Sequence, residues 1–186
     1  MHAYPSILII HITAAFVLCS VLSVEALSLI RLRRASTIEE AQPWIEPVPG
    51  LRLFAVGSVL SIQFSGIYLI YRTSSFGQMW AVVAMATFPL LMAPFGNMTA
   101  RHMRAVRQAF QSKGGSETEL LRMLRARLLK LSLGIRIAAF LGTFVLVSAK
   151  PGLWGAVGIV ASSLAILLAI SSTPWRRIGS PAVPKG

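Results

Sequence analysis

The chain has 186 residues, of which 55% are hydrophobic and 13% are charged, and its mean hydropathy is +0.69. These values do not suit a water-facing surface, and they exclude soluble disorder, a coiled coil and a secreted disulfide scaffold. The composition therefore indicates an integral membrane protein, in which the single Cys19 can form no intrachain disulfide.

Five apolar runs are long enough to cross a bilayer as helices, which takes about 20 residues each. They are residues 6–30, 53–71, 79–98, 131–149 and 153–172. None of them alternates polar with apolar residues, so a transmembrane β-barrel is excluded. The sequence predicts an all-α fold, a polytopic membrane helix bundle with five transmembrane helices, in which residues 1–174 form a single domain.

The connections between these runs differ in length. Residues 73–78 and 150–152 are too short for anything but tight turns. Residues 31–52 contain three prolines, and we expect an extended segment on the membrane surface. Residues 99–130 are expected to form a charged helical hairpin, because the helical pattern continues beyond the apolar runs on both sides. The second arm of this hairpin should begin at Ser116, the first residue of a capping box.

Lysine and arginine residues predict the orientation, because short cytoplasmic loops carry an excess of positive charge. Of the 18 in the chain, all but three lie in residues 31–52, in residues 99–130 and after residue 174. An odd number of crossings places these three segments on one side of the membrane. The N-terminus is therefore expected outside and the C-terminus in the cytoplasm, with residues 175–186 as a disordered tail.

The excess of lysine and arginine in the predicted cytoplasmic segments accounts for most of the net charge of +12. No nucleic-acid-binding motif accompanies the charge, so we expect the lipid bilayer, and no nucleic acid, as the partner of the basic segments. A docking surface for a partner protein on the charged hairpin is the alternative.

Small residues recur every four positions on three predicted helices, and such faces let helix backbones approach closely in lipid. They are Gly57, Ser61 and Ser65; Gly134, Ala138 and Gly142; and Ala161, Ala165 and Ala169. We expect these faces at helix contacts, either within one bundle or in a homo-oligomer.

Glu25 and Arg136 are the formally charged residues inside the five runs. Each lies about five residues from the predicted cytoplasmic end of its helix, which puts both roughly 7 Å below that boundary. A charge at this depth usually faces protein or water, so an ion pair is the most economical arrangement. The pattern leaves open whether the pair is a clasp between two helices or a site for a proton or a substrate.

His11 lies one to two turns inside the outer end of the first run. One interpretation is a hydrogen bond to a neighbouring helix, for example to Gln63 or Tyr68. The other is a metal ligand, because a neutral imidazole binds haem or copper, and His2 with a methionine of the third run could complete a copper site. We predict no cofactor, with haem or copper at His11 as the alternative.

The stretch Leu8-Ile9-Ile10-His11-Ile12-Thr13-Ala14-Ala15 resembles the opening helix of several families of small bacterial membrane proteins. One is a group of uncharacterised predicted integral membrane proteins, and the copper-resistance D and HemJ-type proteins look more distantly similar. The resemblance implies a place in the bacterial inner membrane. At His11, the matching position, it implies a role with haem or protoporphyrinogen.

The sequence contains no phosphate-binding glycine loop, no metal-spaced Cys or His cluster, no nucleophile elbow and no paired carboxylates. We therefore expect a non-enzymatic membrane protein that binds or passes a small solute or ion through a bundle polarised by His11, Glu25 and Arg136. One alternative is a redox or metal-handling protein with His11 as a ligand. Another is an accessory subunit of a membrane complex.

Overall fold

The structure is a computed structural model that describes residues 3–45, 47–111 and 117–172. The described residues form seven α-helices and one 3-10 helix, and they contain no strand. The helices are α1 (Ala3–Arg34), α2 (Ile38–Ile45), α3 (Pro47–Arg72), η1 (Ser75–Gly77), α4 (Met79–Gln111), α5 (Glu117–Leu124), α6 (Arg127–Ala149) and α7 (Leu153–Ser172).

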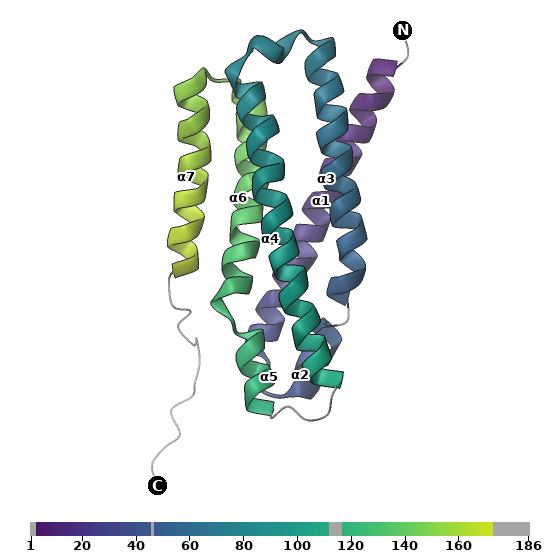
Figure 1. Cartoon of the computed structure of the whole chain (residues 1–186), viewed down its shortest axis with the longest axis vertical. Coiled ribbons are helices and arrows are strands. Elements are labelled where there is room, and N and C mark those ends of the chain that lie inside the picture. The colour runs from purple at the N-terminus through teal and green to yellow at the C-terminus, as the bar shows by residue number, and fades with distance from the viewer. Residues whose placement is uncertain (1–2, 46, 112–116, 173–186) are drawn as a thin grey trace.

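Five helical stretches in the described part of the chain are long and apolar enough to cross a membrane. This confirms the predicted all-α polytopic bundle. In Figure 1, α1, α3, α4, α6 and α7 run alongside one another and alternate in direction, whereas α2 and α5 lie together at one end. The apolar runs were recognisable in the sequence, but the helices that contain them continue beyond them, as in α1 and α4.

The helix α6 is the centre of the packing, and it contacts α4, α7 and α1. Its small residues Gly134, Ala138 and Gly142 are all buried, which confirms that this face lies at helix contacts. A Cβ atom on Gly142 would lie 3.0 Å from the Ser163 hydroxyl of α7, so glycine lets these two helices approach. The tight turn between α6 and α7 is also confirmed, because Lys150 adopts φ 46° and donates its N–H to the carbonyl of Leu146.

The other two faces of small residues behave differently. On α3, Ser65 is buried, but Gly57 is exposed and has open space beside it. On α7, Ala161, Ala165 and Ala169 are all exposed. The expectation of a contact within the bundle is therefore wrong for the alanine face of α7, because α7 turns the side with Ala156 and Ser163 inward. A homo-oligomer through the exposed alanines stays a prediction.

Most of the described residues in the connection over residues 31–52 are helical, so the expected extended segment is wrong. The α1 helix continues to Arg34, and α2 follows after a short turn. The Thr37 hydroxyl accepts the N–H of Glu40, and the Glu40 carboxylate accepts the N–H of Ser36. This capping starts α2, and the burial of Ala41 outweighs the poor helix propensity of Pro43.

The predicted hairpin over residues 99–130 is correct for its first arm and wrong for its second. The α4 helix does continue through Gln111, but the second arm is divided between α5 and α6. At the break, the carbonyl of Arg125 accepts Nη2 of Arg33, and the Arg125 guanidinium donates to the carbonyl of Ala35. These side-chain bonds replace helical bonds at the break. Ser116 and the tail over residues 175–186 lie outside the described residues.

Three apolar clusters follow one another along the bundle. The basal cluster, at the end where α2 and α5 lie, consists of Leu32, Ala35, Ala41, Ile45, Met103, Val106, Leu124 and Leu129. The middle cluster consists of Leu18, Leu22, Phe88, Met92, Leu133 and Ala139. The distal cluster consists of Ile70, Trp80, Ala81, Ala84, Leu146 and Ala156. The polar side chains of interest lie between these clusters or beside them.

Candidate functional site

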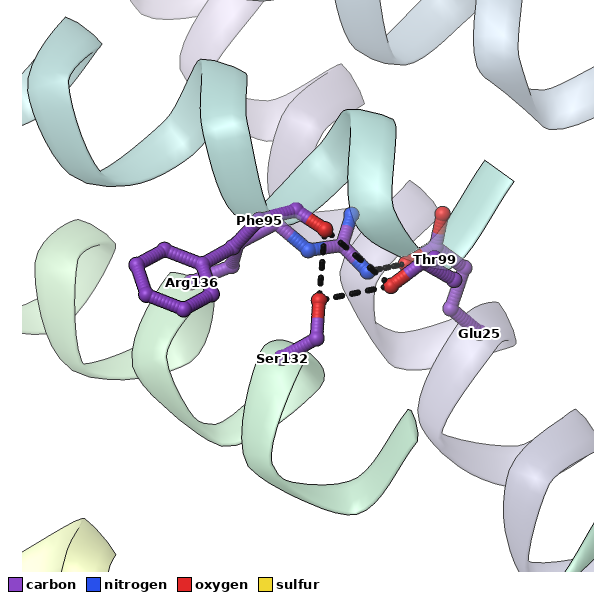
Figure 2. Close-up of polar contacts among 5 residues, drawn as sticks. All are labelled: Glu25, Phe95, Thr99, Ser132 and Arg136. Carbon is purple, nitrogen blue, oxygen red and sulfur yellow. Dashed lines mark hydrogen bonds and ion pairs between the residues drawn. The ribbon is translucent and has the colours of Figure 1, made fainter. Parts of the chain in front are cut away.

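Glu25 of α1 and Arg136 of α6 form a buried ion pair, as the sequence predicted. The Nη2 of Arg136 donates to Oε2 of Glu25, and the two side chains are only 6% and 11% exposed, respectively. Figure 2 shows the guanidinium of Arg136 turned toward the carboxylate. Two charges that are removed from water each carry a large desolvation cost, and their mutual attraction offsets part of that cost.

A chain of hydroxyl groups lies directly beside this pair and joins α4 to α6 (Figure 2). The Ser132 hydroxyl donates to the carbonyl of Phe95 at 2.5 Å, and the hydroxyl oxygens of Thr99 and Ser132 are 2.6 Å apart. The Thr99 hydroxyl also lies within hydrogen-bond distance of the Phe95 carbonyl, at 3.2 Å. Thr99, Ser132 and the Phe95 carbonyl thus form a closed set of three contacts between α4 and α6.

A small cavity of about 30 Å³ lies against the ion pair. Its polar lining consists of Glu25, Ser28, Thr99 and Arg136. The rest of the lining is apolar, with Leu32, Met103 and Leu129 from the basal cluster and Leu133 from the middle cluster. The cavity therefore lies where these two clusters meet, and it has room for about two molecules of the size of water.

One donor of Arg136 has no partner. The residue is 5% exposed, and among the described residues its Nε–H has no hydrogen-bond partner. An unsatisfied buried donor costs about 1–3 kcal/mol, and more when the group is charged. A structural clasp would be more stable if this donor were satisfied.

His11 forms a second and separate polar site. Its Nδ1 lies 2.8 Å from the Ser65 hydroxyl of α3, and that hydroxyl itself donates to the carbonyl of Ser61. The His11 Nδ1–H is therefore the donor to Ser65, which leaves the lone pair on Nε2. The predicted hydrogen bond to a neighbouring helix is confirmed, but the suggested partners, Gln63 and Tyr68, were wrong.

The structure does not bring His11 together with Glu25 and Arg136. His11 and Glu25 are 14 positions apart on α1, which is about 21 Å along the helix axis. Leu18 and Leu22, both of the middle cluster, lie between them on the same helix. The bundle thus has two polar sites at different depths and not one polar face.

Gln63 replaces a backbone hydrogen bond that Pro89 removes from α4. Pro89 has no N–H, so the carbonyl of Met85 lacks its usual partner within α4. The side-chain amide of Gln63 donates to that carbonyl at 3.3 Å. Gln63 therefore joins α3 to α4 at a defect in the helix, and it belongs to neither of the two polar sites.

Among the described residues, no three His, Cys, Asp or Glu side chains lie close enough together to hold a metal ion. The copper site considered above also needs His2, which lies outside those residues. Copper at His11, with a methionine of α4 as a further ligand, and haem at this residue both stay predictions.

Three residues of the site were missed in the sequence, namely Ser28, Thr99 and Ser132. For two of them, the spacing from a charged residue on the same helix could have predicted a place in the site. Ser28 follows Glu25 by three residues and Ser132 precedes Arg136 by four, so each shares a helix face with its charged neighbour. Thr99 has no such charged neighbour on α4, and its place depends on how α4 and α6 pack.

In comparisons with known proteins, no family model, no curated protein and no solved structure matches this chain. By length and composition, the five helices are those of a multi-pass membrane protein. What the sites do has to be argued from their own geometry.

We predict that loss of Glu25 is more harmful than loss of Arg136. Glu25→Gln leaves a buried guanidinium that cannot lose its proton, and we expect a loss of about 3–5 kcal/mol in the free energy of unfolding. Arg136→Gln should cost less, because the remaining carboxylate can take up a proton. Thermal unfolding in a defined detergent measures both. Glu25→Gln combined with Arg136→Gln should recover much of the loss, and a double variant as unstable as Glu25→Gln would contradict pairing as the cause.

We also predict that Gln63 and Pro89 are coupled. Gln63→Leu should lower the free energy of unfolding by about 0.6 kcal/mol, the usual value for such a bond between membrane helices. In a Pro89→Ala background the cost should fall toward zero, because the N–H of residue 89 then donates to Met85. A double-mutant cycle of thermal unfolding measures the difference. Equal costs in both backgrounds would show that Gln63 does not compensate for the proline.

Proposed function

We propose that this chain is a non-enzymatic membrane protein that binds or passes a small solute or ion through its helix bundle. The observation that carries the proposal is that Arg136, whose Nε–H is unpaired among the described residues, lines a small cavity together with Glu25 and Thr99. Buried ionisable groups within a membrane are costly, and they commonly mark substrate or ion pathways. A clasp between α1 and α6 needs the ion pair alone, without an unused donor and adjacent space.

The size of the cavity limits the ligand. Room for about two water-sized groups admits an ion or a solute of a few non-hydrogen atoms. The basal and middle clusters lie on either side of it, so passage across the whole bundle requires these clusters to separate. Binding at the Glu25–Arg136 site is the first event, and passage depends on a second conformation.

We further propose the bacterial inner membrane, with the N-terminus outside and the basal cluster on the cytoplasmic side. The support is the position of the positive charges, since exposed arginines such as Arg31, Arg34 and Arg104 lie on helices that contribute to the basal cluster. The resemblance of the first helix to small bacterial membrane proteins agrees with this location.

Reporter fusions test the orientation. Fusions at Gly114 and Gly186 should report the cytoplasm, whereas a fusion at Ser74 should report the opposite compartment. If Gly114 and Gly186 report different compartments, the proposed arrangement is wrong. Every depth assigned to the sites would then be wrong as well.

A panel of small ligands tests the function. Purified protein in lipid nanodiscs is heated with sodium, potassium, ammonium, chloride, formate or urea. At least one of them should raise the midpoint of unfolding in proportion to the logarithm of its concentration, because it binds the folded state. Arg136→Gln should abolish this shift, whereas Arg72→Gln, which removes an exposed arginine outside the apolar run of α3, should preserve it.

The same preparations separate the alternatives. If no ligand stabilises the wild type and the double variant of Glu25 and Arg136 is fully stable, the pair is a structural clasp. A redox or metal-handling protein is the second candidate, favoured by the His11 Nδ1–H bond, because metal-bound histidines donate their other ring N–H in this way. A Soret band or stoichiometric copper, lost in His11→Gln, would favour that candidate over ours.

A further inference from the structure

The donor geometry of Arg136 points to the chemical class of the ligand. A guanidinium binds a carboxylate best through two parallel N–H bonds. In this structure Arg136, which lines the cavity, uses Nη2 for Oε2 of Glu25, and its Nε–H has no partner among the described residues. Glu25 therefore uses one of the N–H donors of the Arg136 guanidinium, and the Nε–H could bind another acceptor.

Charge balance then fixes what else must bind. The ion pair is neutral, and a net charge in such a buried place is costly. If Glu25 takes up a proton, Arg136 keeps its charge, because arginine does not lose its proton in proteins. An anion must then enter to restore neutrality. One proton on a Glu25 oxygen and one anion on Arg136 amount to the uptake of one molecule of a neutral acid.

We propose that the site takes a proton together with a small monocarboxylate of the size of formate, and that the Glu25 carboxylate stands in its place in this structure. The planar fork of Arg136 favours a carboxylate over a spherical anion. The cavity admits a few non-hydrogen atoms, and its lining contains two hydroxyl groups, Ser28 and Thr99. This inference rests on the proposed function and names its substrate class.

Glu25 and Arg136 are the ionisable side chains of the cavity lining in the part of the chain that the structure describes. On the neighbouring stretch of α4, Arg101 and Arg104 are exposed. Five other ionisable groups nearby have partners outside the cavity. Arg33 donates to the carbonyl of Arg125, Arg52 to Asn97, His102 to the carbonyl of Met123 and Lys130 to the carbonyl of Ile170, and Glu40 accepts from Ser36.

The test measures the binding of sodium formate against pH, with the protein in nanodiscs and the thermal midpoint as the readout. In the wild type, the apparent affinity should weaken as the pH rises, by up to tenfold for each pH unit, because one proton binds with each anion. Glu25→Gln imitates the protonated carboxyl, so its affinity should be at least tenfold higher at neutral pH and independent of pH. Glu25→Gln combined with Arg136→Gln should not respond.

The outcomes separate this inference from the proposed function. If sodium, potassium, ammonium or urea stabilises the protein and formate does not, the inference is wrong and the proposed function stands. Sodium chloride at equal ionic strength is the control for the anion, and an equal shift with chloride would overturn the preference for a carboxylate. If nothing in the panel shifts the wild type at any pH, both proposals fail. The wild-type pH series decides the matter even if Glu25→Gln does not fold.

Discussion

A charge that is surrounded by apolar side chains has to be balanced by a nearby charge of opposite sign, and this requirement organises the centre of the molecule. Glu25 and Arg136 balance each other's charge, and their ion pair joins α1 to α6. The hydroxyl chain of Thr99 and Ser132 then holds α4 against the same stretch of α6. Three of the long helices thus meet at one polar point between two apolar clusters.

The parts of this arrangement that depend on local sequence could be predicted. The number of long helices follows from the lengths of the apolar runs, because each run must satisfy its backbone hydrogen bonds internally in lipid. The pairing of Glu25 with Arg136 follows from their equal depth and from the cost of leaving either alone. Both arguments need only the positions of residues along single helices.

The parts that depend on distant residues could not be predicted. The break between α5 and α6 is stabilised by Arg125, whose guanidinium bonds a carbonyl 90 residues earlier in the chain. The α2 helix forms despite Pro43 because Ala41 becomes buried in the basal cluster. The partner of His11 depends on how α3 is rotated, and the apolar pattern of α3 is too uniform to define that rotation. For the same reason Thr99 could be placed on α4 but not beside Arg136.

The last helix takes no part in this polar centre. The α7 helix adds no side chain to the cavity lining or to the hydroxyl chain. It packs closely on α6 where Gly142, which has no side chain, leaves room for Ser163. Substitutions on its outward alanines therefore leave the chemistry around Arg136 untouched. Lipid or a second copy of this chain could cover that surface without rearranging the ion pair.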